Sequence, residues 1–276
     1  MKNIVITGST QGIGYGLADE FLALGCKVAV SGRAPDRVEL ATAALSARHP
    51  PDARMYSSSR MYSSSLFGCL CDVTHADQVQ ALWDAAQARF GQVDIWINNA
   101  GLGNLQSDFW ELSPEEMQTV VETNVVGAMY GARVAIRGML AQGFGALYNV
   151  EGLGSDGRRV RGLALYSTTK CALAYLTDSL IEETKGTPVL VGALRPGMVM
   201  TRLVTQQYKG HPEEWEKVKR IFNILADRVE TVTPWFARQV LENNKHGVRI
   251  KWLSGAKLMG RFLTAPFRRR DMLAES

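Results

Sequence analysis

The sequence predicts an α/β protein in which a parallel sheet is covered by helices on both faces. Short apolar runs alternate along the chain with longer segments of helical periodicity, an arrangement that is typical of parallel sheets. No linker divides the 276 residues, so we expect one domain over residues 1–276. Apolar residues make up 46% and charged residues 21%, as in ordinary globular proteins, which argues against a coiled coil or a disordered chain.

The predicted strands are six short apolar runs at residues 3–7, 27–31, 66–71, 93–97, 146–150 and 189–194. Between the third and fourth runs, one face of a helix is indicated by the spacing of Val79, Leu82, Ala86 and Phe90. A helix start is indicated at Ser113, where a capping serine precedes a proline and a glutamate follows at the third helical position. Further starts are indicated by Thr74 with Asp77 and by Thr233 with Pro234.

The net charge of +4 is small, but the basic excess is concentrated at the C-terminus. Residues 247–276 carry seven basic and two acidic side chains, interspersed with Trp252, Phe262 and other apolar residues. This basic amphipathic segment suggests peripheral contact with an anionic membrane surface, although a subunit or domain contact explains it equally well. No nucleic-acid-binding module accompanies the charge, so we expect no nucleic-acid partner.

The four cysteines, at positions 26, 69, 71 and 171, match neither a disulfide framework nor a zinc site. We therefore expect no metal, and reduced thiols in a reducing compartment such as the cytoplasm, or a plastid for a processed plant-type form. No apolar run approaches the roughly 18 residues of a membrane span, which favours a soluble or at most peripheral protein. The repeated Arg-Met-Tyr-Ser-Ser-Ser at 54–59 and 60–65 is interpreted as a duplicated surface loop.

A glycine-rich turn connects the first strand to the first helix. Gly8, Gly12 and Gly14 allow a pyrophosphate to approach the backbone, and the following helix offers free N–H groups and a positive dipole end. The strand before and the helix after make this a predicted dinucleotide site. The remaining candidate contacts in the turn are Ser9, Thr10 and Ile13.

The end of the second strand predicts which dinucleotide binds. Arg33 stands where a carboxylate would select NAD, and its guanidinium suits the 2′-phosphate of NADP(H), so NADPH/NADP is the expected cofactor. An ordinary surface arginine is the alternative. Asp72 ends the third strand and could accept the adenine amino group, with Val73 beside it as a further candidate contact.

Tyr166 and Lys170 are four residues apart, which places them on one face of a helix. An ammonium beside a phenol favours the phenolate and is expected to draw the tyrosine pKa toward neutrality, making Tyr166 a usable acid.

Together these residues resemble the short-chain dehydrogenase/reductase family. Further matches in the family's order are Asn98-Asn99-Ala100-Gly101, Asn124, Pro196-Gly197 and Thr201. The resemblance implies a Rossmann-type, doubly wound, seven-stranded parallel sheet of order 3-2-1-4-5-6-7, with 248–252 as the last strand. It implies that Tyr166 is the acid/base, that Lys170 also holds the nicotinamide ribose, that Asn124 anchors a relay water and that Thr201 holds the carboxamide. The cofactor contacts it implies also include Asn99, Ala100, Gly101, Pro196 and Gly197, and it implies a homo-oligomer.

The chain departs from the family at a serine usually placed about thirteen residues before the tyrosine. Leu153 stands there, and Ser155 follows two residues later between glycines that permit an unusual backbone path. Either Ser155 replaces the missing hydroxyl or it is a turn serine.

The same stretch, with Arg195-Pro-Gly-Met-Val199 and Ile221-Phe-Asn-Ile-Leu225, is similar to the chlorophyll b reductase branch. That likeness implies NADPH-dependent reduction of the C7 formyl group to hydroxymethyl on a lipophilic substrate, beneath a lid insertion near 202–232. Two alternatives stay open: reduction of another lipophilic carbonyl (a quinone, steroid or acyl compound), and an NADPH-binding sensor without turnover.

Overall fold

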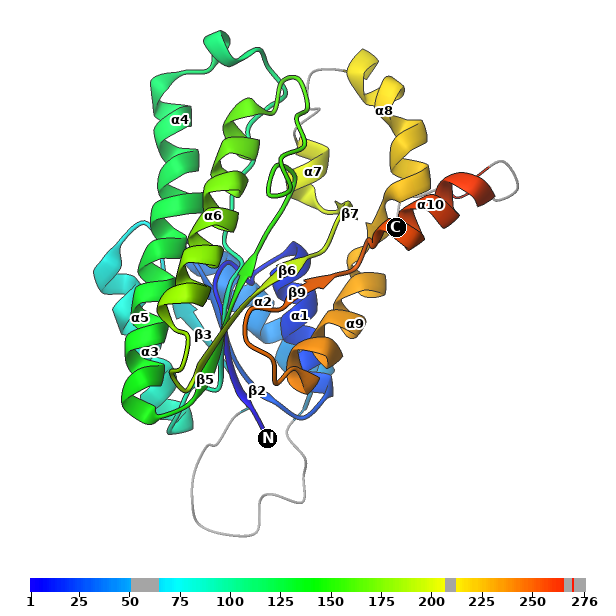
Figure 1. The fold of residues 1–276 in the computed structure, drawn as a ribbon. Helices are drawn as coiled ribbons and strands as arrows, with labels where there is room; N and C mark the ends of the chain where they lie inside the picture. Colours follow the sequence, from blue (N-terminus) through cyan, green and yellow to red (C-terminus); the bar gives the residue numbers. More distant parts are fainter. Residues whose placement is uncertain (51–64, 207–211, 266–269, 271–276) are drawn as a thin grey trace.

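The computed structural model describes residues 1–50, 65–206, 212–265 and 270 (Figure 1). Residues 54–64, which hold all but the last residue of the duplicated segment, lie outside this range. No described helix combines the length and the apolar content that a membrane crossing requires. All four cysteines are free thiols.

A seven-stranded sheet forms the centre of the molecule, in the order β3-β2-β1-β4-β5-β6-β9, with every neighbouring pair parallel. This confirms the predicted fold class and strand order, with β9 as the seventh strand. The strands are β1 (Asn3–Ile6), β2 (Lys27–Gly32), β3 (Leu66–Leu70), β4 (Ile95–Asn98), β5 (Gly145–Val150), β6 (Val189–Arg195) and β9 (Arg249–Lys251).

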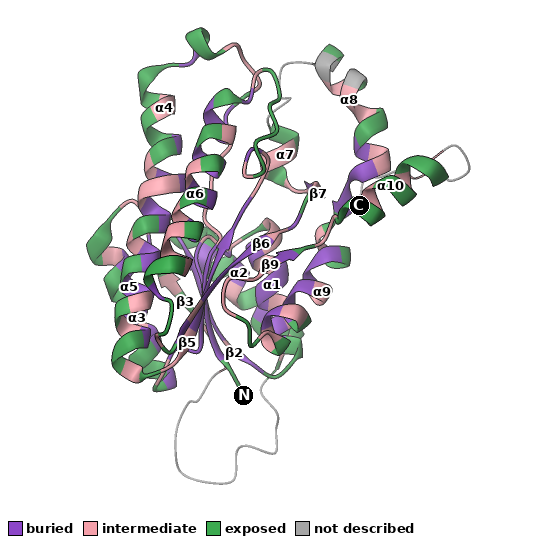
Figure 2. Ribbon diagram, viewed as in Figure 1, coloured by how far each residue is buried: buried purple, intermediate pink, exposed green. Residues whose placement is uncertain are grey.

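Helices cover both faces of the sheet because successive strand residues point to opposite sides. In β1, Ile4 and Ile6 join the core cluster that includes residues of α1, α2 and α9, whereas Val5 joins the cluster that includes residues of α3 and α5. Figure 2 shows burial concentrated in the strands and in the helix faces that meet them. The covering helices are α1 (Gly12–Ala23), α2 (Pro35–Arg48), α3 (Ala76–Phe90), α5 (Gly127–Gln142), α6 (Ala164–Glu183) and α9 (Val229–Glu242).

The predicted helix starts have different outcomes. Ser113 caps α4 (Pro114–Val121) by accepting a hydrogen bond from the Glu116 N–H at 3.1 Å, as expected. The start predicted at Thr233 and Pro234 is wrong, because α9 begins at Val229 directly after a short strand and Thr233 bonds to the Val229 carbonyl inside the helix.

The segment after β6 projects beyond the sheet and rejoins it at α9. β7 (Val199–Met200) pairs in parallel with β8 (Asp227–Arg228), and this two-stranded ladder closes the base of the insertion. Between them lie α7 (Arg202–Gln206) and α8 (Pro212–Leu225). After β9 the chain forms α10 (Gly255–Thr264), which lies beside α8 and is exposed along most of its length (Figures 1 and 2). The segment predicted as a lid, near 202–232, contains α7, α8, β8 and the start of α9, and its action as a lid stays a prediction.

Candidate active site

The glycines of the turn after β1 are required by backbone angle or by close packing. Gly8 and Gly12 have φ angles of +61° and +59°, which glycine adopts readily. A Cβ on Gly14 would lie 2.4 Å from Asn99 Nδ2 and 2.8 Å from the Gly8 carbonyl oxygen. At the start of α1, the Gln11 side chain makes no capping bond. The turn therefore offers uncapped N–H groups and a positive dipole end to an anion, which fits a pyrophosphate.

The loop after β4 is tied to this turn. Asn99 Nδ2 donates to the carbonyls of Thr7 and Gly8 at 3.0 and 2.9 Å, and the backbone N–H groups of Asn99 and Ala100 donate to Thr7 Oγ1. Ser9 is fully buried, with its hydroxyl donating to the Ile6 carbonyl and accepting from the Ser31 N–H. The Ser9 side chain therefore faces the sheet, and the Ser9 N–H also donates to the Ser31 carbonyl at 2.9 Å, so Ser9 supports the turn from within.

Arg33 is exposed directly after β2, and its charge acts on the Asp72 carboxylate across the ends of β2 and β3. Although burial acts in the opposite direction, hydrogen bonds from Thr74 and nearby positive charges hold the pKa of Asp72 below its usual value. Thr10 lies against Gly32, where a Cβ would be 2.7 Å from the Thr10 methyl. These groups form the edge where the adenosine end of a dinucleotide would lie.

Thr201, just after β7, closes the other side of the turn. A Cβ on Gly12 would meet its side chain at 3.5 Å, in ordinary contact. Pro196 is buried at the end of β6, and Gly197 follows with a φ of +74°. Val73 is buried and packs against Gly127 at the start of α5. The structure thus gathers the predicted cofactor residues around the carboxyl ends of β1, β2, β3, β4 and β6.

Tyr166 and Lys170 lie together on α6, both buried. Lys170 Nζ is 5.9 Å from the centroid of the Tyr166 ring and donates to the Val150 carbonyl at 2.9 Å. A Cβ on Gly101 would be 3.7 Å from the same nitrogen, so Lys170 also borders the loop after β4. The phenol and the ammonium are therefore next to the cofactor edge of the sheet.

The expected effect of Lys170 on the Tyr166 pKa is wrong. Burial raises the pKa of the Tyr166 phenol to about 12, because removing water from a phenolate outweighs the ammonium at this separation. Burial also lowers the pKa of Lys170 to about 8, against the opposing charge of Glu151. At neutral pH the phenol is protonated and the lysine is mostly charged.

Asn124 lies in a π-helical turn, η3 (Glu122–Val126), between α4 and α5. Its Oδ1 accepts from the Leu102 N–H at 2.7 Å, and its Nδ2 donates to the Leu102 carbonyl and to Thr169 Oγ1. The side chain is therefore engaged with the protein and holds the loop after β4 against α6. The family resemblance implies a relay water at Asn124. Because the side chain is engaged, a backbone group of this turn would have to hold that water.

The position facing the Tyr166 hydroxyl is Gly152, one residue before Leu153. A Cβ on Gly152 would lie 2.5 Å from Tyr166 Oη. Ser155 closes the turn over this glycine, since both its Oγ and its N–H donate to the Gly152 carbonyl, at 2.7 and 3.1 Å. The structure therefore shows Ser155 as a turn serine next to the phenol. To donate to a substrate oxygen, its hydroxyl would have to leave the Gly152 carbonyl.

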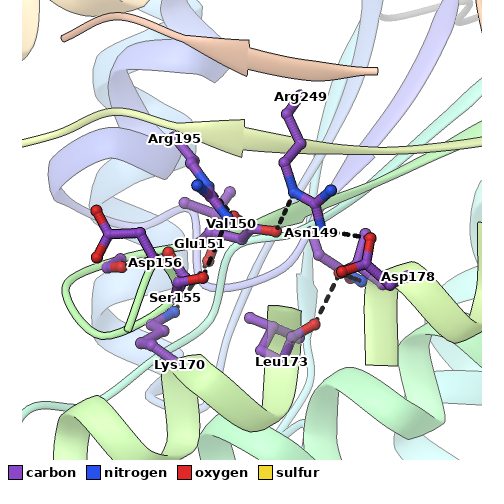
Figure 3. Close-up of polar contacts among 12 residues, drawn as sticks. Asn149, Val150, Glu151, Ser155, Asp156, Lys170, Leu173, Asp178, Arg195 and Arg249 are labelled. Carbon is purple, nitrogen blue, oxygen red and sulfur yellow. Dashed lines mark hydrogen bonds and ion pairs between the residues drawn. The ribbon is translucent and has the colours of Figure 1, made fainter. Parts of the chain in front are cut away.

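Sequence reasoning missed an ionic cluster behind this turn (Figure 3). The buried Glu151 carboxylate is paired with Arg195 from the end of β6 and with Arg249 from the start of β9, and Arg249 also pairs with Asp178 of α6. A glutamate directly after a buried strand was the one available signal, because a charge at such a position requires partners.

Comparison with known proteins agrees with the geometry. Residues 2–212 match the family model described as short chain dehydrogenase. The chain is 35% identical over 265 residues to chlorophyll(ide) b reductase NOL, chloroplastic, of Arabidopsis thaliana, covering 92% of this chain and 71% of that protein. It is 30% identical over 272 residues to the probable chlorophyll(ide) b reductase NYC1, chloroplastic, of the same plant, covering 97% of this chain and 54% of that protein. The chain thus spans only about half the length of the second relative.

Among solved structures, the fold matches a variant of actinorhodin polyketide ketoreductase crystallised with NADPH. The TM-score is 0.77 at 24% identity, over 93% of this chain and 97% of the ketoreductase. At this identity the match shows a shared fold.

Proposed function

The chain belongs to the short-chain dehydrogenase/reductase family, an oxidoreductase family that uses nicotinamide cofactors, and on that premise we propose an NADPH-dependent carbonyl reductase. The proposed substrate is chlorophyll b or chlorophyllide b, whose C7 formyl group becomes hydroxymethyl. The observation that carries this proposal is the Tyr166–Lys170 pair beside a glycine cradle, in a chain whose relatives over nearly its whole length are named chlorophyll(ide) b reductases.

The chain's own residues fit a dinucleotide. The pyrophosphate would lie at the amino end of α1, against Gly8, Gly12 and Gly14, and the adenosine between Arg33 and Asp72. Arg33 is exposed at the place where a 2′-phosphate would bind, which supports NADPH over NADH. The nicotinamide half would face Lys170, Thr201 and the Asn99–Gly101 loop.

In the proposed reaction, bound NADPH supplies the hydride that forms the new C–H bond at the formyl carbon. The Tyr166 hydroxyl donates its proton to the formyl oxygen, and the phenolate then regains a proton from water beside Lys170. A phenol whose pKa is about 12 still protonates an alkoxide readily, because an alkoxide is the stronger base. The protonated resting state of Tyr166 therefore favours reduction over alcohol oxidation at neutral pH.

The lid side of the molecule suits a large apolar substrate near a membrane. α10 exposes Met259, Phe262 and Leu263, with Ile221 of α8 also exposed nearby. We propose that this apolar face of α10 rests on a membrane surface; the described arginines of 247–276, Arg249, Arg261 and Arg270, pair with acidic groups of the protein instead. Sedimentation with anionic vesicles tests it: Phe262→Ser should reduce bound protein, and unchanged binding would refute this contact.

A direct assay tests the proposed function. Purified protein is mixed with NADPH and detergent-solubilised chlorophyll b, and the formyl-type absorption bands are followed. We expect these bands to decline with the wild type and turnover to fall at least about 10³-fold in Tyr166→Phe, which removes the proton donor. Reduction of a quinone, steroid or acyl carbonyl in place of chlorophyll b would reassign the substrate, and binding of NADPH without any turnover would favour a sensor.

A further inference from the structure

The Glu151 cluster is not used by the reaction as described above, yet it lies beside Ser155 and Lys170 (Figure 3). The Glu151 side chain is 0% exposed. Its Oε2 accepts from Arg195 Nε and its Oε1 from Arg249 Nε at 3.3 Å. Burying a carboxylate is unfavourable unless close partners offset the lost hydration, and here two guanidinium groups do so. The cluster therefore fixes the backbone at the end of β5.

Arg195 connects the Glu151 cluster to the 151–155 turn, which lies against the Tyr166 phenol. Arg195 Nη2 donates to the Ser155 carbonyl at 3.1 Å, while its Nε binds Glu151. A single guanidinium thus joins both ends of the 151–155 turn, and Ser155 closes the turn on Gly152. Because Gly152 lies against the Tyr166 hydroxyl, the cluster determines how closely the backbone approaches the proton donor.

The same carboxylate acts on Lys170. The lysine donates to the carbonyl of Val150, the residue before Glu151, and the charge of Glu151 favours the ammonium against the effect of burial. The loop after β4 and the η3 turn border the lysine with Gly101 and Asn124, which carry no charge. On its own helix the titratable neighbour is Tyr166. Among the described residues, Glu151 is the acidic one whose charge acts on Lys170.

We propose that Glu151, held by Arg195 and Arg249, is a positioning residue for the reaction: it fixes the Gly152–Ser155 turn against Tyr166 and provides the counter-charge of Lys170. Only the effect of Glu151 on kcat depends on the proposed carbonyl reduction. The placement of Lys170 and of the turn is a property of the protein without substrate.

The test compares three variants. Glu151→Gln removes the charge and keeps the shape, whereas Glu151→Asp keeps the charge and shortens the reach. Asp178→Asn is the matched control, since Asp178 is 58% exposed at the far end of the cluster and contacts Arg249 rather than the turn. The readouts are the pH titration of the Lys170 13Cε resonance, recorded without cofactor or substrate and assigned by its loss in Lys170→Arg, and kcat for NADPH-dependent reduction.

In the wild type the Lys170 resonance should titrate near pH 8. In Glu151→Gln we expect the midpoint to fall by about one unit and kcat to fall about 10²-fold, because the counter-charge is lost and the turn is displaced. In Glu151→Asp the midpoint should stay near that of the wild type while kcat still falls, and Asp178→Asn should match the wild type in both.

An unchanged midpoint in Glu151→Gln, or a kcat within twofold of wild type in that variant, overturns the proposal. If Glu151→Gln fails to fold, Glu151→Asp tests the proposal alone. A kcat of Glu151→Asp equal to that of wild type then contradicts the positioning role. Failure of the wild type to reduce chlorophyll b would instead count against the proposed function, and the NMR titration, which needs no substrate, would still test Glu151.

Discussion

In the cofactor region, close packing and hydrogen bonds of uncharged groups hold the site together: Gly14 lies so close to the side-chain amide of Asn99 and the carbonyl of Gly8 that even a methyl group would collide. At the base of the lid, charged side chains have that role. The Asp227 carboxylate, with its side chain 3% exposed, accepts from Arg261 at 2.6 Å and from Arg270 at 2.9 Å. It also accepts from the indole N–H of Trp252 at 2.6 Å.

These contacts join elements that are far apart in the chain. Arg261 and Arg270 also donate to the Leu225 and Ile224 carbonyls at the end of α8, so α10 and Arg270 are attached to α8 and β8. The contrast suggests that the two regions have different mechanical roles. A rigid cradle suits a cofactor that is the same in every turnover, whereas an ionic attachment lets the covering helices be displaced without disturbing that cradle.

The largest effect expected from this contrast is that of Gly14→Ala. The added methyl group must displace Asn99 and the turn, and overpacking of this kind costs about 1–3 kcal/mol. We expect NADPH to bind about tenfold to a hundredfold more weakly by fluorescence titration. Gly260→Ala in α10, where a Cβ meets nothing within 4 Å, is the matched control and should bind NADPH normally. Equal affinities in the two variants would show that the cradle is not tightly packed.

Asp227→Asn should affect the lid and spare the cradle. Loss of the charge weakens the contacts that the Asp227 carboxylate makes with the two guanidinium groups, so the attachment of α10 should loosen. We expect faster hydrogen exchange across 255–264 and a KM for the carbonyl substrate raised about tenfold, with NADPH affinity within about twofold of wild type. Asp84→Asn, an exposed residue of α3, is the control. A loss of NADPH affinity as large as the rise in KM in Asp227→Asn would contradict these separate roles.

A smaller, more selective effect is expected at Arg33. A charge-assisted hydrogen bond contributes about 1.5–3 kcal/mol, so Arg33→Ala should reduce a preference for NADPH over NADH by about tenfold or more while leaving NADH affinity nearly unchanged. Arg37→Ala, another exposed arginine just inside α2, is the control. If the parent protein binds the two cofactors equally, Arg33 does not select NADPH.

The cofactor region was also the more predictable one. Its glycines, the strand runs and the Tyr166–Lys170 spacing are local patterns, and they predicted a parallel α/β fold with a dinucleotide site, whereas the strand order came from the family resemblance. The remaining features depend on contacts between distant residues. Glu151, Arg195 and Arg249 come from three strand ends, and Asp227 meets Arg261 and Arg270 only after folding, so no spacing reveals them.

One local inference also failed for a reason that only the fold supplies. The Tyr166 pKa follows burial, which cannot be read from a four-residue spacing. The role of Ser155 stayed open in the sequence, because only the fold shows that its hydroxyl bonds to the carbonyl of Gly152, the residue that lies against the phenol.

The central claim is that this chain transfers a hydride to a carbonyl while Tyr166 supplies the proton. NADPH carrying deuterium at C4, prepared as each stereoisomer, is incubated with the protein and chlorophyll b, and the product is analysed by mass spectrometry. The claim predicts one deuterium on the new hydroxymethyl carbon from one stereoisomer only, and no product from Tyr166→Phe. Reduced product without deuterium from either stereoisomer, or equal product from Tyr166→Phe, would contradict it.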